Sequence, residues 1–259
     1  MIIDTHCHLD DERYDDDIDD VLARASQAGV KTIIIPGADP RHLPRAQALS
    51  ETHERLYFAV GVHPYHAQDY DKALLARLIS HPKCVAVGEC GLDYYRLSDD
   101  PEIALADVAR QKEIFCDQIA LAKRYKKPLI VHIRDASRDS KEILLAHGAE
   151  EVGGVLHCYN ADEELLSLAM QGFYFGIGGV VTFSNAKKLI NVFPKIPREK
   201  LILETDAPYL TPHPHRGTRN EPAYTTLVAE KVAMLWDTQV TDVAHLTTQN
   251  ACRLFGFVS

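Results

Sequence analysis

The stretch Pro128-Leu129-Ile130-Val131-His132-Ile133 sets the pattern for the chain, because it is a short, continuous apolar run with one histidine near its end. Such runs are typical of parallel strands that are buried on both faces. Similar runs recur throughout the sequence. The predicted strands are Ile2–Thr5, Thr32–Ile35, Tyr57–Val62, Val85–Glu89, Leu129–Ile133, Val155–His157, Phe173–Ile177 and Leu201–Glu204.

Segments long enough for a crossover helix separate these strands. Apolar residues at helical spacing predict helices over Asp19–Ala28, Gln111–Tyr125, Ala161–Gln171 and Glu221–Leu235. Eight strands alternating with helices over 259 residues match the size of a (β/α)8 barrel. An open doubly wound sheet has the same alternation, but no G-x-G-x-x-G motif follows the first strand. The prediction is an α/β protein with one TIM-barrel domain over residues 1–259.

Composition excludes several classes of protein. The chain has 28 Lys+Arg against 37 Asp+Glu, a net charge of −9, which argues against a non-specific nucleic-acid coat. Residues 10–20 hold eight of the acids and one arginine, so most of this charge is local and does not argue against nuclease chemistry elsewhere. There is no signal-peptide pattern, no run long enough to span a membrane and no CxxC pair, so we expect a cytoplasmic protein without membrane contact.

Side chains that bind metals recur where the predicted strands end. They are His6, His8, His63, Glu89, His132, His157 and Asp206. In a (β/α)8 barrel the C-terminal ends of the strands form one mouth, so residues far apart in sequence meet there. Strand side chains alternate between faces, which places both histidines of the first strand on one side and turns Cys7, Cys90 and Cys158 away as packing residues.

A buried cluster of imidazoles and carboxylates is costly unless a partner compensates it, and bound divalent ions would do so. Ligands without thiolate suit Zn²⁺ or Mn²⁺, whereas more carboxylate and water would suit Mg²⁺. Two such ions can share a carboxylate and hold a hydroxide between them, and can then act on a phosphodiester or on a carbonyl. Spacing alone does not choose between these reactions.

Several motifs occur in order from one end of the chain to the other. They are Asp4-Thr5-His6-Cys7-His8-Leu9-Asp10, Gly61-Val62-His63-Pro64, Gly88-Glu89-Cys90-Gly91-Leu92-Asp93-Tyr94-Tyr95, Pro128-x-x-Val131-His132-x-Arg134-Asp135-Ala136, Gly154-x-x-His157-Cys158-Tyr159 and Leu203-Glu204-Thr205-Asp206-Ala207-Pro208-Tyr209-Leu210. Together they resemble the TatD family of metal-dependent deoxyribonucleases. The resemblance implies a TIM-barrel hydrolase of the amidohydrolase-like group that cleaves DNA phosphodiesters, chiefly as an exonuclease, with divalent metal and typically Mg²⁺.

The resemblance also implies two metal sites joined by one carboxylate, with His6, His8 and Asp206 at one ion, His132 and His157 at the other, and Glu89 bridging them. Glu89 and Asp206 are the catalytic candidates. In the expected mechanism a hydroxide that bridges the metals attacks phosphorus in line with the leaving oxygen, and Asp206 can also take the proton from the nucleophilic water.

Other residues are candidates for substrate contact. His63 is expected either to contact a phosphate or metal or to have a structural role near the Pro64 turn. Arg134 lies two residues past His132, on the same side of the strand, and can grip a phosphate bidentately or form a surface salt bridge with Asp135.

The stretch Thr211–Tyr224 is expected to overhang the mouth, where Arg216 and Arg219 would supply positive charge for a DNA end or would pack their loop. Glu204 can orient a ligand from behind. Tyrosines that follow strand ends can stack on unpaired bases or pack their loops; they are Tyr94, Tyr95, Tyr159 and Tyr209.

The expected partner is therefore DNA, single-stranded or with frayed ends. Two alternatives remain open: a deacylase, lactonase or deaminase that uses the same metals on a small carbonyl substrate, and a non-catalytic metal-binding protein. An aqueous mouth lined by Arg and Tyr favours DNA, whereas a closed apolar pocket favours a carbonyl substrate. The oligomeric state is not fixed by the sequence, and a monomer is expected.

Overall fold

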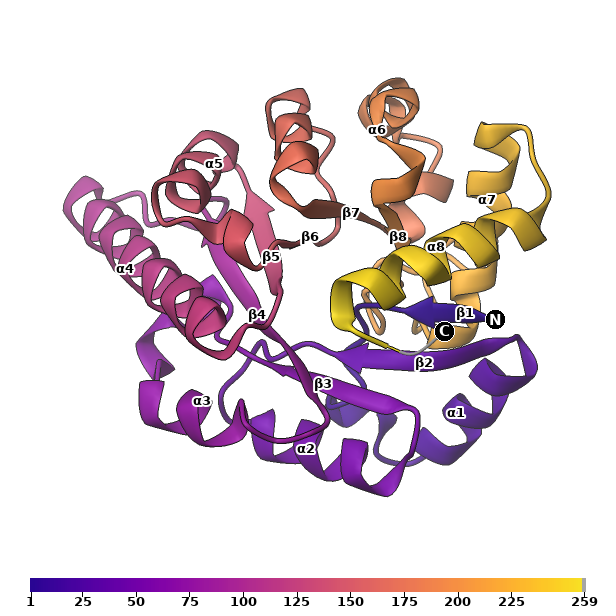
Figure 1. Cartoon of the computed structure of the whole chain (residues 1–259), viewed down its shortest axis with the longest axis horizontal. Coiled ribbons are helices and arrows are strands. Elements are labelled where there is room, and N and C mark those ends of the chain that lie inside the picture. The colour runs from indigo at the N-terminus through magenta and orange to yellow at the C-terminus, as the bar shows by residue number, and fades with distance from the viewer. Residues whose placement is uncertain (258–259) are drawn as a thin grey trace.

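The computed structural model describes residues 1–257 and shows parallel strands at the centre of the molecule with helices outside them (Figure 1). The strands form one 8-stranded sheet in chain order, and each neighbouring pair is parallel. They are β1 (Ile2–Asp4), β2 (Val30–Ile35), β3 (Leu56–Val60), β4 (Cys84–Asp93), β5 (Leu129–Arg134), β6 (Gly154–Leu156), β7 (Phe173–Ile177) and β8 (Leu201–Leu203). The predicted (β/α)8 barrel is confirmed.

The barrel closes between β1 and β8 through a few backbone contacts. Thr5 N donates a hydrogen bond to Leu203 O at 3.1 Å, and Asp206 N donates to His6 O at 2.9 Å. Cys7 and Ala207 form an isolated parallel bridge beyond the strand ends. This closure brings the residues that follow β1 and β8 side by side.

Helices surround the strands, and no helix within residues 1–257 is long and apolar enough to cross a membrane. The α-helices are α1 (Ile18–Gln27), α2 (Leu43–Thr52), α3 (Lys72–Leu78), α4 (Pro101–Tyr125), α5 (Ser137–Ala146), α6 (Lys187–Val192), α7 (Thr225–Trp236) and α8 (Val240–Phe255). The helix predicted over Asp19–Ala28 is α1. The one predicted over Glu221–Leu235 is α7, preceded by the short 3-10 turn η8 (Pro222–Tyr224).

Two other predicted helices differ from the structure. The prediction Gln111–Tyr125 covers only the second part of α4, which begins at Pro101 because the Asp100 side chain caps it by accepting from Glu102 N at 2.9 Å. The α-helix predicted over Ala161–Gln171 is wrong, since this segment is the 3-10 helix η4 (Glu163–Gln171).

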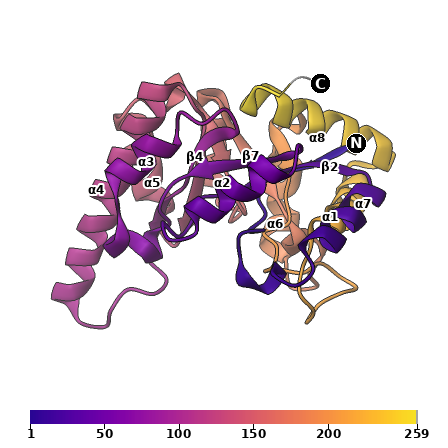
Figure 2. The same cartoon turned by 90° about the horizontal axis from the view of Figure 1, so that it is seen from below.

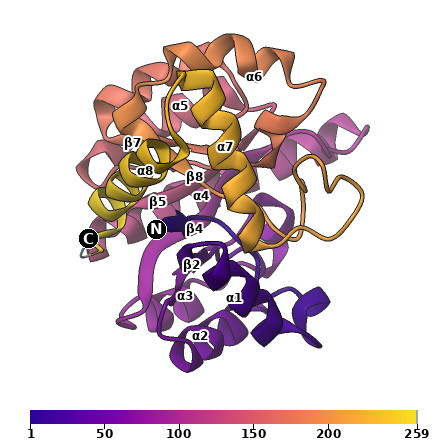
Figure 3. The same cartoon turned by 90° about the vertical axis from the view of Figure 1, so that its right-hand side faces the viewer.

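The barrel interior is apolar at its N-terminal end. Each strand contributes one buried residue there: Ile3, Ile34, Ala59, Ala86, Ile130, Val155, Tyr174 and Ile202. Ala251, Cys252 and Phe255 of α8 pack on this layer and cover it. In Figures 2 and 3, α8 lies at one end of the barrel and the loop between β8 and α7 lies at the opposite end. The predicted metal-binding residues lie at that opposite end, where the strands end.

Strand β4 changes the face it presents part-way along. Ala86 points into the barrel interior. The register between β4 and β5 then shifts between Val87 and Cys90, and beyond the shift Cys90 and Leu92 pack in the outer core between strands and helices. Glu89 and Asp93, which alternate with them, therefore face inward.

A tight backbone contact with the loop after β2 holds Glu89 in place. Gly37 N donates to Gly88 O at 2.9 Å, and Glu89 N donates to Gly37 O at 3.0 Å. A Cβ at Gly37 would overlap the backbone of Gly61 and Gly88, so this approach requires glycine.

Candidate metal centre

The structure brings the predicted metal-binding residues together at the C-terminal ends of the strands, with Glu89 at their centre. Glu89 Oε2 lies 3.3 Å from His6 Nε2. Glu89 Oε1 lies 3.0 Å from His132 Nδ1 and 3.7 Å from His157 Nε2. The two oxygens of one buried carboxylate thus face two different groups of histidines, which is the arrangement a bridging ligand needs.

Asp206 completes the first of these groups. Its Oδ1 lies 3.6 Å from His6 Nε2 and 3.5 Å from His8 Nε2, and the two imidazole nitrogens are 3.2 Å apart. Ligands bonded at about 2.1 Å to one ion lie about 3.0–3.4 Å apart at right or tetrahedral angles. The spacing of these donor atoms therefore fits the shell of one divalent ion, and the nitrogen and oxygen donors suit such an ion chemically.

The histidines of the second group are each held from behind by a buried carboxylate. His157 Nδ1 lies 3.1 Å from Glu204 Oε1, and His132 Nε2 lies 2.9 Å from Asp93 Oδ2. In both residues the other ring nitrogen faces Glu89. A carboxylate behind a histidine fixes the ring orientation and raises its basicity toward a metal.

The contact expected of Glu204 is thus present, whereas the sequence analysis did not single out Asp93. Asp93 follows Glu89 by four positions, a spacing that puts two strand side chains on one face, but the predicted strand ended at Glu89 and so did not include Asp93. Glu204 fits because its neighbour on β7 is Gly176, where a Cβ would overlap the carboxylate. Cys158 N also donates to Glu204 Oε1 at 2.6 Å.

We expect Glu204→Gln to weaken divalent-metal affinity by roughly 10–100-fold, because the amide cannot hold His157 as the carboxylate does. Calorimetric titration of the metal-free protein with Mn²⁺ measures this change. Glu199→Gln, an exposed residue before β8, is the matched control and keeps the parent affinity. Equal affinities for the parent and Glu204→Gln would contradict the positioning role.

In this cluster burial and the neighbouring charged groups have opposite effects on the pKa values. Burial lowers the pKa of His157, but the carboxylates of Glu204 and Glu89 raise it to about 10. Burial raises the pKa of Glu89, but His6, His63 and His157 hold it well below its usual value. Asp206 has a lowered pKa for the same reason, with His8 as hydrogen-bond partner. The carboxylates therefore stay ionised at neutral pH, in the form that binds cations.

His63 contacts both the turn at Pro64 and the metal-binding cluster. Its Nδ1 accepts a hydrogen bond from Tyr65 N at 3.1 Å and caps the 3-10 helix η2 (Pro64–Asp69). Its Nε2 lies 3.7 Å from Glu89 Oε1, and its ring meets the edge of His132 with centroids 4.3 Å apart. One nitrogen thus supports the turn while the other faces the cluster.

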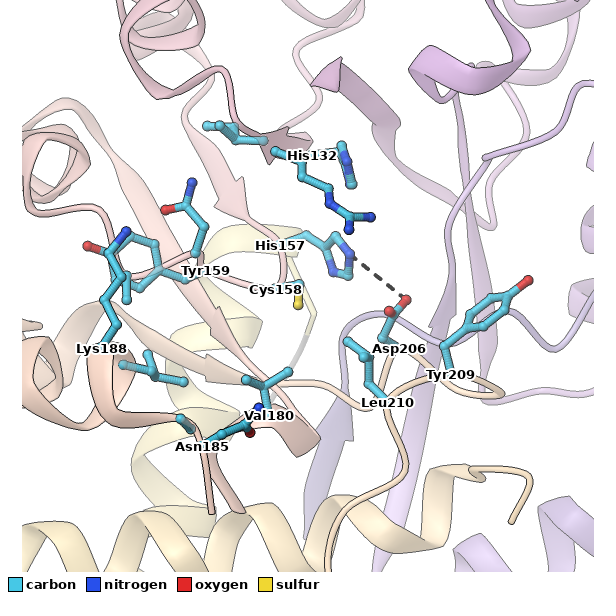
Figure 4. A pocket seen from close by; sticks show the side chains of 16 residues that line it. His132, His157, Cys158, Tyr159, Val180, Asn185, Lys188, Asp206, Tyr209 and Leu210 are labelled. Atoms are coloured by element: carbon cyan, nitrogen blue, oxygen red, sulfur yellow. Dashed lines mark ion pairs between the residues drawn. The ribbon is translucent and has the colours of Figure 1, made fainter. Parts of the chain in front are cut away.

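Two adjoining cavities meet at the cluster. The first, of about 490 Å³, is lined mostly by apolar groups from Tyr159, Val180, Leu189 and Leu210, and we call it the apolar cavity. Figure 4 shows its lining, with His157 and Asp206 facing each other and their Nε2 and Oδ1 atoms 3.9 Å apart.

The second cavity, of about 340 Å³, contains His8, His63 and Glu89 and extends to Tyr65 and Arg96. We call it the arginine cavity. The residues common to both cavities are His132, Arg134, His157, Asp206 and Tyr209. The cluster is therefore reached from two sides.

Of the three arginines predicted to contact the substrate, one lies at the cluster and two lie away from it. Arg134 lines both cavities, and no salt bridge with Asp135 forms. Arg219 lies outside both cavities and binds both carboxylate oxygens of Asp17, at 2.8 and 2.6 Å. Arg216 is also outside them, donates to a backbone carbonyl and stacks on Phe183 at 3.9 Å. The structure thus does not bring Arg216 and Arg219 to the site.

The expectation for Cys158 is wrong, although Cys7 and Cys90 are buried packing residues as predicted. Cys158 lines the apolar cavity. The cause is that β6 ends at Leu156 and Cys158 has a φ of 42°, so strand alternation no longer applies to it.

Of the tyrosines that follow strand ends, two line the cavities and two do not. Tyr209 and Tyr159 line the cavities. Tyr95 is exposed beneath Arg134, whose guanidinium carbon lies 3.5 Å from the ring centre. Tyr94 packs its loop, because its hydroxyl donates to Asp139 at 2.8 Å.

Residues 3–256 match the family described as TatD related DNase. The chain belongs to the TatD family. The relative YabD of Bacillus subtilis, described as an uncharacterized metal-dependent hydrolase, is 44% identical over 98% of this chain and 99% of its own length. The TatD protein of Erwinia tasmaniensis, described as a 3'-5' ssDNA/RNA exonuclease, is 34% identical over 98% of this chain and 99% of its own.

A solved TatD homologue has the same fold. The crystal structure of YjjV from Escherichia coli superposes with a TM-score of 0.89 at 32% identity, covering 99% of this chain and 98% of the other. Together these relatives place the chain in a family of metal-dependent hydrolases, and the buried cluster around Glu89 is its candidate metal-binding site.

Proposed function

We propose that this TatD-family chain hydrolyses phosphodiester bonds of DNA, acting on single-stranded or frayed ends as an exonuclease. The observation that carries the proposal is the position of Arg134, an exposed cation without an ion-pair partner within residues 1–257, on the rim shared by both cavities. A phosphate group at the cluster would meet this guanidinium. The family description and the name of the Erwinia relative support the same chemistry.

The cluster would hold two divalent ions, with Mg²⁺ proposed as the working metal and Zn²⁺ or Mn²⁺ also suited to the ligands. The proposed ligands are His6, His8 and Asp206 for one ion, His132 and His157 for the other, and Glu89 for both. Bound ions would supply Lewis-acid stabilisation of the charge that develops on the phosphate and would lower the pKa of water.

The side chains would accept a proton, bind the phosphate and position the metal ligands. Asp206 is ionised and its side chain is 16% exposed, so it can accept the proton of the attacking water at the open face of the cluster. Arg134 can donate two parallel hydrogen bonds to a phosphate oxygen pair. Glu204 and Asp93 keep His157 and His132 in place without touching the substrate.

A second candidate function is hydrolysis of a small carbonyl substrate, such as an amide or lactone. The apolar cavity favours it, because such cavities of a few hundred Å³ enclose small ligands. The arginine cavity on the other side of the cluster favours a longer anionic substrate instead. The two functions therefore differ in which cavity the substrate needs.

End-labelled single-stranded DNA with Mg²⁺ or Mn²⁺ distinguishes these functions. The parent is expected to shorten the DNA only with metal, and Glu89→Ala and Asp206→Ala are expected to fail. Assays on N-acyl amino acids and lactones run in parallel. The nuclease proposal would be refuted if the parent showed no metal-dependent DNA cleavage, or if both variants cleaved DNA as fast as the parent. Turnover of a carbonyl substrate instead would support the second candidate.

Divalent metal is expected to stabilise the fold, because only the folded chain brings the ligand atoms together, for example His6 Nε2 and His8 Nε2 at 3.2 Å. At 100–1,000 times Kd the gain is about 3–4 kcal/mol, or roughly 5–15 °C in Tm. Thermal unfolding with Mn²⁺ and with EDTA measures it. His8→Asn should lose most of the shift, and His53→Asn, remote from the cluster, should keep it. An unchanged Tm in the parent would contradict metal binding here.

A further inference from the structure

Two arginines beside the cluster have no neutralising partner within residues 1–257. Arg96 and Arg134 are exposed, and both line the arginine cavity. Within residues 1–257 neither guanidinium makes an ion pair or a side-chain hydrogen bond. Free guanidinium donors in a concave site attract anions, and phosphate groups match their planar geometry.

Each of these guanidinium groups is stacked on an exposed tyrosine. The Arg134 guanidinium carbon lies 3.5 Å from the centre of the Tyr95 ring, and that of Arg96 lies 4.8 Å from the centre of the Tyr65 ring. Stacking restrains the planar group from one face and leaves its N–H edge free. Both arginines are therefore held in place for a ligand.

The two tyrosines are themselves anchored to the metal centre. Tyr95 N donates to Asp93 Oδ1 at 2.9 Å, and Tyr65 N donates to His63 Nδ1 at 3.1 Å. Asp93 in turn holds His132. The distance of each arginine from the cluster is thus set by residues of the cluster.

The cavities place the arginines in a definite order. Arg134 borders the apolar and arginine cavities, at the cluster itself. Arg96 borders the arginine cavity and a third cavity of about 240 Å³, which continues along η2 and α4 to Gln68 and Arg110. A path leading outward from the cluster therefore meets Arg134 first and Arg96 second.

The opposite rim of the mouth is neutralised. Arg13 also stacks on a tyrosine of the mouth, with its guanidinium carbon 4.5 Å from the Tyr209 ring centre. Its guanidinium, however, is bound by both carboxylate oxygens of Asp11, at 2.8 and 2.7 Å. The free arginines of the rim thus lie toward β4 and η2, whereas the apolar cavity is lined by Lys188, a cation without an ion-pair partner within residues 1–257. The direction of the path therefore rests on the order of Arg134 and Arg96 along the connected cavities.

We propose that Arg96 binds the phosphate adjacent to the scissile one, so that the nucleic-acid strand leaves the cluster along η2 and α4. The proposal rests on the DNA hydrolysis proposed above and narrows its substrate class. The preferred substrates are strands with at least two consecutive phosphates, and a dinucleotide with a single phosphodiester is a poorer one because it does not reach Arg96.

Cleavage of two short substrates tests this assignment. A thymidine dinucleotide has one phosphodiester and a trinucleotide has two. Arg96→Gln is expected to lower kcat/KM for the trinucleotide by roughly tenfold, the worth of one hydrogen-bonded charge contact, and to leave that for the dinucleotide unchanged. Arg13→Gln is the matched control, because it removes a stacked but neutralised arginine from the other rim, and should change neither value.

Binding provides a readout that does not depend on turnover. Fluorescence anisotropy of a labelled oligothymidylate in EDTA, over a series of salt concentrations, gives the slope of log K against log salt. Arg96→Gln should reduce this slope by about 0.7, the value for one phosphate contact to a single strand. Arg13→Gln should leave it unchanged.

Two results would overturn the assignment while leaving the nuclease proposal intact. One is equal loss of kcat/KM on both substrates in Arg96→Gln, which would place Arg96 at the scissile phosphate. The other is that Arg96→Gln leaves unchanged both kcat/KM for the trinucleotide and the slope of log K against log salt. If the parent cleaves neither these substrates nor longer DNA, the proposed function itself fails, and the assignment of Arg96 fails with it.

Discussion

Glu89→Gln is expected to lower kcat for DNA hydrolysis by about 10³–10⁴-fold with little change in fold. The two oxygens of Glu89 face His6 on one side and His132 and His157 on the other. Glutamine has the same shape but only one acceptor oxygen and no charge, so it cannot join two ions. Single-turnover cleavage of labelled single-stranded DNA, with metal content measured on the same samples, checks this expectation.

Glu221→Gln is the matched control for this variant. Glu221 is also largely buried, but its carboxylate pairs with Arg24 of α1, at 2.8 Å, and not with the cluster. It should keep the parent kcat even if it loses some stability. If Glu89→Gln binds metal and cleaves DNA as the parent does, Glu89 is not the shared ligand.

The strands were predictable because a buried parallel strand reads as a continuous apolar run wherever it occurs. β7 agrees with its prediction at both ends, Phe173 and Ile177. β4 does not, since it continues to Asp93, where Leu92 and Asp93 pair with Ile133 and Arg134 of β5. That pairing depends on the neighbouring strand and leaves no local trace in the sequence.

The meeting of His132 and His157 was predictable from two rules, strand alternation and the common mouth of a barrel, whereas His6 and His8 lie beyond the end of β1. His132 and His157 follow the interior residues Ile130 and Val155 by two positions, as alternation requires. Glu89 does not follow Ala86 in this way, and it faces inward only because the strand register shifts after Val87. Its place at the mouth was predicted from the end of its strand and its bridging role from the family resemblance, but its inward direction could not be derived from alternation.

Which arginines lie free at the site could not be predicted from their positions in the sequence. Arg96 lies in the loop after β4, and its placement depends on Tyr65, which belongs to the 3-10 helix η2. Arg219 does follow the last strand, but it pairs with Asp17 outside both cavities. Side-chain pairing between distant segments decides which charges stay free, and neither spacing nor composition reports it.

The acidic segment at residues 10–20 now has a structural explanation. Asp11 binds Arg13, Asp15 pairs with Arg45, and Asp17 pairs with Arg24 and Arg219. Three of its eight carboxylates are therefore paired with arginines. One of these arginines, Arg13, lies on the Tyr209 side of the mouth.

Asp206→Asn is expected to lower kcat/KM by about 10³-fold or more at neutral pH, because it removes the proton acceptor and weakens one metal position. The lowered pKa of Asp206 means that in the parent the carboxylate is ionised throughout the neutral range, so its contribution is lost only in acid, as the pH falls through that pKa. In the variant the attacking water has no base. Its residual rate should therefore rise about tenfold per pH unit, following hydroxide.

The pH profile separates the two roles of Asp206. If it acted only as a metal ligand, saturating Mn²⁺ would restore the rate of Asp206→Asn and its profile would match the parent. If it also accepts the proton, the slope with pH persists at saturating metal. Asp135→Asn removes an exposed carboxylate from the loop after β5 and should preserve both rate and profile. A parent-like profile for Asp206→Asn at saturating metal would leave the proton to another acceptor, and His63, 3.7 Å from Glu89, would be the next side chain to substitute.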